Sequence, residues 1–250
     1  MIHYKTPDEI KTMQKGGAIL RAVMQEVIPQ VVPGMTTLEI DRMVQKGLKT
    51  RGADLSFNKV DGYSWAICAS VNAQIVHTPP SSYVLKNGDL LTIDAGAYVG
   101  GYHTDFATSF VVGDLRNEEI EKFLQVGKDA LADAIKAVKV GNYIGDISKA
   151  FQDRIESGGY SIVKRLTGHG VGKDLHEEPY VPCFVSKPRE QTVQITPGLV
   201  IAVEVMYAMG SGEMIQEPGN DWSLITKDGS LSAQFEHSLA VSDKNTLILT

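Results

Sequence analysis

The chain has 250 residues, a net charge of −6 and 43% hydrophobic residues, which is the composition of a globular protein with one large or two small domains. It has no run of lysines or arginines typical of a nucleic-acid surface, no apolar stretch as long as a membrane span and no signal-peptide pattern. Because its only cysteines, Cys68 and Cys183, give no disulfide framework, we expect a soluble, cytoplasmic protein.

The first fifty residues predict two helices. Thr6-Pro7-Asp8-Glu9 combines a capping threonine, a proline suited to the first turn and the glutamate of a capping box, and apolar residues at helical spacing continue to about Ile28. Pro33-Gly34 then breaks the chain. Residues 36–39 offer a second capping box, and the helix that follows is expected to end at Gly52.

After a strand-like stretch at residues 66–71, the run from Leu90 to Phe110 contains two aspartates in apolar surroundings. Gly100-Gly101 between its two extended halves predicts a two-residue hairpin, which places Asp94 opposite Ala107. Asp105 then lies on the same face, on a diagonal of about 7–8 Å between Cα atoms. Buried like charges repel unless a proton or a cation lies between them. The hairpin is therefore either exposed, with two solvated aspartates, or one side of a divalent cation site.

The helical pattern resumes after Gly113 and repeats the first part of the chain. Asn117 opens a helix that is interrupted before a second one ends at residues 158–159. This weak repeat predicts two α+β halves, about 1–113 and 114–250, within a single domain of residues 1–250 and with a site at their junction. The alternative is a chance similarity between helix–glycine–helix patterns. The repeat matches Gly34, Ile40 and Gly52 with Gly141, Ile147 and Gly159, each 107 positions later.

A histidine among glycines follows in Gly168-His169-Gly170-Val171-Gly172. The spacing and context are not those of a dinucleotide-binding loop. His169 therefore either marks a close approach of backbone and ligand or is a hydrogen-bonded structural histidine. The next motif, His176-Glu177-Glu178-Pro179, resembles the start of a helical zinc motif, but the proline breaks a helix and Tyr180 replaces the second histidine.

Two further carboxylates lie within apolar strand-like runs, Glu204 in residues 199–206 and Glu236 in residues 231–241. Glutamate is almost never fully buried without a partner. Each carboxylate alone has an ordinary explanation, but four of them with one histidine, on separate strands, favour a metal centre. Oxygen-rich ligation with one imidazole suits Mn, Co, Fe or Zn, and bridging carboxylates hold two ions about 3.5–4 Å apart.

In chain order, Asp94, Asp105, His169, Glu204 and Glu236 resemble the metal ligands of the type I methionine aminopeptidases. These belong to a wider family with the Xaa-Pro dipeptidases and aminopeptidases. The resemblance covers essentially the whole chain and implies the pseudo-twofold "pita-bread" α+β fold. Further matching motifs are residues 5–10, 32–34, 70–72, 168–172, 176–179 and, the most specific, 228–237.

The resemblance implies a metal-dependent aminopeptidase that removes the N-terminal residue, initiator methionine, from peptides and nascent proteins. Asp94 would chelate one of two divalent ions (Co, Mn, Fe or Zn), Asp105 and Glu236 would bridge both, and His169 and Glu204 would bind the other. A metal-bound hydroxide would attack the first carbonyl, with Glu204 as the proton shuttle.

The resemblance also implies contacts with the substrate. His77 and His176 would hydrogen-bond the scissile peptide, although each is otherwise a surface or structural histidine. A methionine pocket would be lined by Tyr63, Cys68 and Trp222. Val60 and Leu175 stand where two other pocket aromatics are expected.

Some details depart from the type I pattern. Residues 78–80 are Thr-Pro-Pro instead of Gly-Ile-Pro, and residues 94–96 and 101–105 are closer to the Xaa-Pro branch. An Xaa-Pro-type peptidase with the same dinuclear core is therefore the alternative function. A non-catalytic binding module is disfavoured because all five ligand positions are intact. The expected partners are peptide or nascent-chain N-termini near the ribosome, with no specific nucleic acid and no membrane, and the expected state is a monomer.

Overall fold

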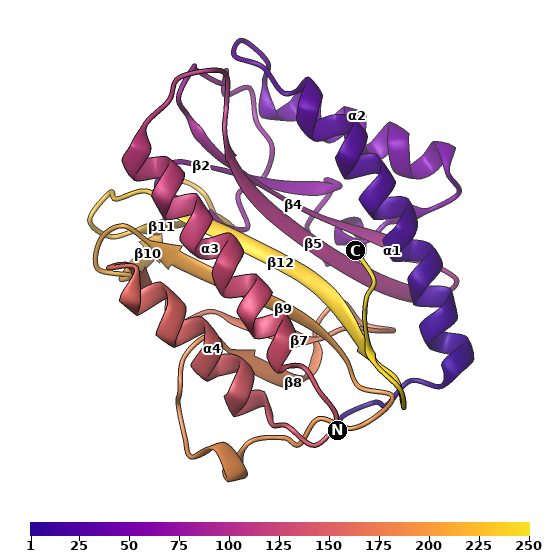
Figure 1. Cartoon of the computed structure of the whole chain (residues 1–250). Coiled ribbons are helices and arrows are strands. Elements are labelled where there is room, and N and C mark those ends of the chain that lie inside the picture. The colour runs from indigo at the N-terminus through magenta and orange to yellow at the C-terminus, as the bar shows by residue number, and fades with distance from the viewer.

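Four helices lie against one face of a ten-stranded sheet in the computed structural model, which describes residues 1–250 (Figure 1). None of the helices combines the length and apolar character that a membrane crossing requires. Short 3₁₀ turns cover residues 28–30, 57–59 and 189–191. The helices are α1 (Pro7–Val27), α2 (Thr37–Thr50), α3 (Glu118–Ala137) and α4 (Ile144–Ser157).

The helix starts predicted from capping residues are confirmed. At α1, Glu9 N–H donates to Thr6 Oγ1 at 3.4 Å while Thr6 N–H donates to Glu9 Oε2 at 2.8 Å. Residues 36 and 39 form the same reciprocal box at α2. At α3 the Asn117 side chain accepts hydrogen bonds from the two backbone N–H groups of residues 119 and 120. These bonds pair N–H groups that the first turn of a helix otherwise leaves free.

The repeat at an offset of 107 recurs in the helix bounds. Both α2 and α4 have 14 residues, and each bound of α4 lies 107 positions after that of α2. Gly34 and Gly141, which precede these helices, have positive φ angles of 94° and 90°. Ile40 and Ile147 are both fully buried. The division of the chain at residue 113 stays a prediction.

All strand pairs of the main sheet are antiparallel. The path runs β1-β4-β5-β12-β9-β7-β8, with β2 on β4, β6 on β9 and β13 on β12, and a small sheet has the order β10-β11-β3. The strands are β1 (Asp54–Leu55), β2 (Ile67–Val71), β3 (Gln74–Val76), β4 (Leu90–Val99), β5 (Tyr102–Val111), β6 (Ser161–Ile162), β7 (Thr167–Gly170), β8 (Glu177–Pro182), β9 (Val200–Ala208), β10 (Met214–Gln216), β11 (Leu224–Thr226), β12 (Ser232–Val241) and β13 (Thr246–Ile248).

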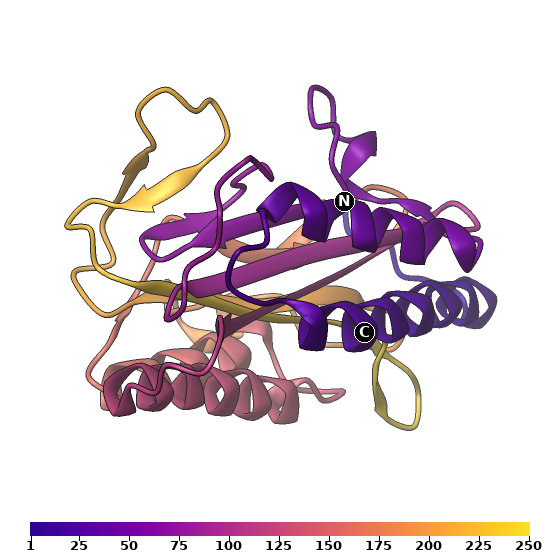
Figure 2. The ribbon, with the colours of Figure 1, turned by 90° about the horizontal axis from the view of Figure 1, so that it is seen from above.

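The two helix pairs cover different parts of the sheet. α1 lies against β4 and β5 with α2 beside it, whereas α3 lies against β9 and β12 with α4 beside it. Seen from above in Figure 2, the indigo pair and the pink pair occupy separate places along the sheet. Each pair buries its own apolar cluster, one that includes Ile93 and Ala95 and one that includes Val203, Val205 and Phe235. The opposite face of the central strands is left for polar side chains.

Candidate metal centre

Strand alternation directs the carboxylates away from the helices. Successive side chains of a strand point to opposite faces. Glu204 lies between Val203 and Val205, which pack under α3 and α4. By the same alternation Asp94 lies between two residues of the α1–α2 cluster, and Glu236 follows a residue of the α3–α4 cluster. Each of these acidic side chains therefore projects from the face of the sheet that no helix covers.

The sheet register aligns these residues in one row across four strands. The predicted hairpin is confirmed, since Asp94 pairs with Ala107. Ala107 pairs in turn with Glu236, and Glu236 pairs with Glu204. Asp105 lies two residues before Ala107 on the same face of β5. The small alanine in the middle of the row leaves space between the longer acidic side chains.

His169 completes the cluster from β7. Its Nε2 atom lies 3.6 Å from Glu204 Oε1 and 3.9 Å from Asp105 Oδ2. Its Nδ1 atom lies 2.8 Å from the carbonyl oxygen of Gly170, which accepts a hydrogen bond when Nδ1 carries the proton and leaves Nε2 free as a ligand. Asp105, His169 and Glu236 each offer one ligand atom, and these atoms lie within 4.8 Å of one another.

The glycines beside His169 serve the packing of strands. A Cβ atom at Gly168 would collide with the carbonyl oxygen of Ala202, and one at Gly170 with that of Glu178. We expected a close approach of backbone and ligand at this motif, whereas these two glycines instead allow β7 to approach the backbones of β9 and β8.

The electrostatics of the cluster favour a bound cation. Burial raises the pKa of Asp105 to about 7, and burial together with the Asp105 charge raises the pKa of Glu204 to about 8. Burial and the neighbouring acids raise the pKa values of Asp94 and Glu236 well above their usual range. Burial also lowers the pKa of His169 to about 3, so the ring is neutral at pH 7. A divalent cation would stabilise the charged carboxylates and the neutral imidazole together.

Unpartnered buried oxygen atoms support the fit of a metal. Asp94 Oδ1 and Glu236 Oε1 are buried without a hydrogen-bond partner. An unpaired buried polar atom costs about 1–3 kcal/mol. Carboxylate oxygens with one imidazole nitrogen form a donor set suited to hard or borderline divalent ions. The residues present therefore fit a divalent metal.

The cluster lies in a cavity of about 430 Å³ that has a second, apolar end. There the Tyr63 and Trp222 rings meet edge to face, with centroids 5.1 Å apart. The Tyr63 hydroxyl donates to the carbonyl oxygen of Ile67 at 2.8 Å, so its polar group is satisfied within the protein. The side chains at this end are Phe57, Val60, Tyr63, Cys68, Leu175 and Trp222.

The two histidines expected at the scissile peptide also line this cavity. His77 has a positive φ of 60°, a conformation uncommon outside glycine and often associated with functional sites. The His77 side chain is exposed at the cavity mouth, but the surrounding protein and the nearby His176 lower its pKa to about 4. The surrounding protein also lowers the pKa of His176, which is likewise exposed and whose ring centroid lies 4.4 Å from that of His169. Both are therefore neutral hydrogen-bonding groups near pH 7.

Gln234 is a further polar residue of the cavity, one to which we assigned no role from the sequence. Its Nε2 atom donates to Glu204 Oε2 at 3.0 Å, and its Oε1 atom is buried without a partner. The signal was available, because Gln234 lies two residues before Glu236 and so faces the same side of β12. Arg165 and Tyr180 also line the cavity, and no sequence pattern indicated them.

Comparisons with known proteins agree with this geometry. The profile of metallopeptidase family M24 matches residues 11–243. Methionine aminopeptidase 1 of Bacillus subtilis (strain 168) is 36% identical over 250 residues, which are 100% of this chain and 99% of the relative. The crystal structure of a methionine aminopeptidase from Thermotoga maritima is similar with a TM-score of 0.95 and 33% identity, covering 100% of this chain and 99% of that one.

A prolidase from Pyrococcus furiosus is also similar in structure, with a TM-score of 0.77. Its identity is 20%, and the match covers 99% of this chain but 65% of the prolidase. At this identity the likeness concerns the fold, and it agrees with the expected pita-bread architecture.

Proposed function

Since the chain belongs to metallopeptidase family M24 and to the methionine aminopeptidases within it, we propose that it removes the N-terminal methionine from peptides and nascent proteins. The observation that carries this proposal is the single cavity in which a carboxylate–imidazole cluster adjoins an apolar end. The carboxylate–imidazole cluster would provide hydrolytic metal chemistry. The apolar end would provide a place for one apolar side chain of the substrate.

We propose that the cluster holds two divalent ions, drawn from Co, Mn, Fe and Zn. Asp94 and His169 would each bind a different ion, with Glu204 on the ion of His169, and Asp105 and Glu236 would bridge the two. All five side chains line the same cavity, which supports this assignment. The chemistry that such ions supply is the polarisation of a carbonyl oxygen and a lowered pKa of water.

The protein's own groups move the protons. Glu204 accepts the proton that the attacking water loses and passes it to the departing amine, a role that its place in the cavity beside the other carboxylates supports. Gln234 Nε2 donates to the other oxygen of this carboxylate and so orients it. His77 and His176, both neutral, hydrogen-bond the scissile peptide as the tetrahedral state forms.

The apolar end receives the first side chain of the substrate. Tyr63, Cys68 and Trp222 line it, and methionine sulfur packs favourably against aromatic rings. Val60 and Leu175 contribute aliphatic surface where aromatics were expected. The pocket discriminates among apolar side chains by about 1–3 kcal/mol, the usual range for a hydrophobic site.

The Xaa-Pro alternative is not favoured. The relatives similar over the whole chain are methionine aminopeptidases, whereas the prolidase shares the fold at lower identity. For the oligomeric state, the location and the partner, we propose a monomer in the cytoplasm that acts on nascent chains near the ribosome. The two buried, unpaired cysteines support a reducing compartment.

Peptide hydrolysis tests the proposal. Metal-stripped protein, supplemented with Mn or Co, is assayed on Met-Ala-Ser, Ala-Pro-Ala and Met-Pro peptides. We expect rapid release of methionine from Met-Ala-Ser and slow cleavage of the proline peptides. Preferential cleavage of the proline peptides would contradict the methionine assignment, and no turnover with either metal would contradict the catalytic role.

A further inference from the structure

A buried ion pair joins the N-terminal segment to the strand that follows His176. Lys5 Nζ lies 2.5 Å from Glu177 Oε2, and the two side chains are 1% and 11% exposed. Buried ion pairs are weak sources of stability, because the cost of removing both charges from water offsets their attraction. The pair therefore calls for another role, such as fixing the position of one segment against another.

Glu177 closes the turn that carries two cavity residues. Its second oxygen, Oε1, accepts the Asp174 N–H at 3.2 Å. Leu175 and His176 lie between these two residues, and both line the cavity. Because one end of the Glu177 carboxylate is held by the turn and the other by Lys5, the ion pair fixes the turn relative to the N-terminal segment.

Three parts of the chain meet at this ion pair. The Lys5 N–H donates to the Gly198 carbonyl oxygen at 2.7 Å, just before β9. The Gly172 carbonyl oxygen accepts the N–H of His103, in β5, at 2.7 Å. A Cβ atom at Gly172 would lie 2.5 Å from both Glu177 Oε1 and Lys5 Cε, so a larger residue there would displace the ends of both side chains.

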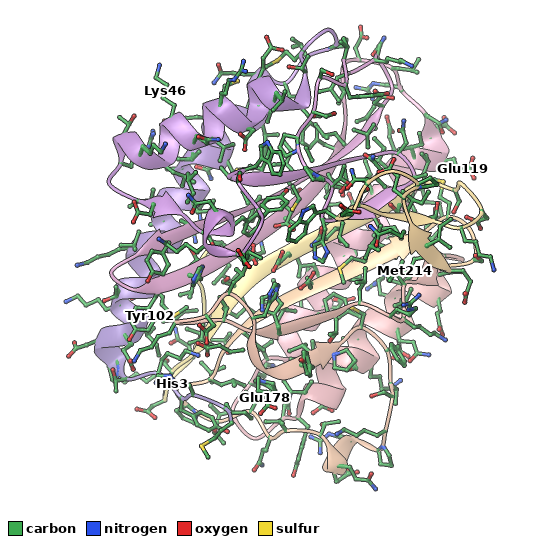
Figure 3. All side chains as sticks on the ribbon, turned by 180° about the vertical axis from the view of Figure 1, so that it is seen from behind. His3, Lys46, Tyr102, Glu119, Glu178 and Met214 are labelled. Carbon is green, nitrogen blue, oxygen red and sulfur yellow. The ribbon has the colours of Figure 1, made fainter.

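The neighbouring contacts follow the same edge of the molecule. The Met1 amino group lies 3.1 Å from Glu178 Oε2, and the Tyr102 hydroxyl donates to Glu9 Oε1 at 2.5 Å. Figure 3 shows His3, Tyr102 and Glu178 in the lower left part of the view, along this edge. The N-terminal segment thus spans from the hairpin of β4 and β5 to β8.

We propose that Lys5 and Glu177 are positioning residues that hold His176 in place beside the carboxylate cluster. This inference rests on the proposed function, because it assigns the pair a part in placing a group that hydrogen-bonds the scissile peptide. Neither Lys5 nor Glu177 lines the cavity, so both act through the 174–177 turn. A displacement of about 1 Å in such a group costs up to about a hundredfold in rate.

The test uses Lys5→Met, which keeps the length of the side chain and removes its charge, with Lys5→Arg as the conservative variant. We expect Lys5→Met to lower kcat on Met-Ala-Ser about tenfold or more, with a smaller change in KM, and Lys5→Arg to recover most of it. In a His176→Ala background, Lys5→Met should have little further effect, because the group it positions is absent. An equal loss of kcat in both backgrounds would overturn the proposal.

Hydrogen exchange of the metal-free protein gives a readout that does not depend on turnover. Lys5→Met should increase exchange in residues 172–178 more than elsewhere, and unchanged exchange in this turn would overturn the proposal. The matched control is Glu178→Gln, which removes the adjacent ion pair with Met1, where the Glu178 side chain is 58% exposed. This control should change neither measurement. If wild-type protein does not cleave Met-Ala-Ser, the proposed function fails while the exchange result still decides the positioning role.

Discussion

The two ends of the cavity are built in opposite ways. At one end four acidic side chains surround a neutral histidine, and Asp94 and Glu236 each keep one buried oxygen without a partner. At the other end the lining is apolar, and the Tyr63 hydroxyl is bonded within the protein. The charged end therefore needs a cation, whereas the apolar end is complete without a ligand. This difference teaches that the charged end governs turnover and the apolar end governs the choice of the first residue. Variants at one end should therefore leave the property of the other end unchanged.

The largest effect is expected for Glu204→Gln, which removes the proton acceptor at the charged end. Turnover should fall by about 10²–10⁴-fold or more, the usual contribution of general acid–base catalysis. Stability of the metal-free protein should be nearly unchanged, because glutamine avoids the cost of a buried acid whose pKa is already raised. Peptide assays and thermal unfolding measure both quantities. Near-normal activity would refute the role, and Glu190→Gln, at an exposed position, is the control.

Replacement of either cavity histidine by alanine should have the next largest effect. We expect His176→Ala and His77→Ala to lower kcat by about 10²–10³-fold, since each removes a hydrogen bond that strengthens in the transition state. Metal content, measured by elemental analysis, should stay at the wild-type level. Loss of metal in these variants would place the histidines among the ligands instead.

A change at the apolar end should act on binding. Trp222→Ala removes the ring that faces Tyr63, and we expect KM for Met-Ala-Ser to rise by about 10–200-fold, which corresponds to about 1–3 kcal/mol. Metal affinity, measured by calorimetry, should not change. A fall in metal affinity together with an unchanged KM would contradict the separation of the two ends.

The smallest expected effect is a dependence of the stability of the metal-free protein on pH. Native Asp105 and Glu204, with pKa values raised to about 7 and about 8, keep protons that the unfolded chain has already lost. Their contribution to stability is present at low pH and is lost as the pH rises through these values. Between pH 6.5 and 8 we expect the free energy of unfolding to fall by about 1.4 kcal/mol per pH unit for each retained proton.

This pH range begins at 6.5 because the titration of histidines below pH 6.5 makes the stability rise, not fall, with increasing pH. Buried His169 and His103 have lowered pKa values of about 3 and about 4, so they destabilise the native state as the pH falls below 6.5. Urea unfolding of chelator-treated protein measures the slope, and added Mn should remove it. A metal-free protein whose stability is constant or increases from pH 6.5 to 8 would contradict the electrostatic account.

Much of the fold could be predicted because its signals are local. Capping boxes at Thr6 and Thr36 and helical spacing defined α1 and α2, and Gly100-Gly101 defined the hairpin and its register. The acids inside apolar strands were visible one by one. The proposed roles of the site residues remain predictions that the variants above test.

The sequence by itself determined the helices, the hairpin and the alternation that turns Asp94, Glu204 and Glu236 away from the apolar core, because these depend on residues close together in the chain. Only the tertiary structure decided that β5 pairs with β12, which brings Ala107 beside Glu236. It also decided the contact of Lys5 with Glu177, which are 172 residues apart. Such pairings depend on the packing of the whole sheet, and no local spacing or propensity encodes them.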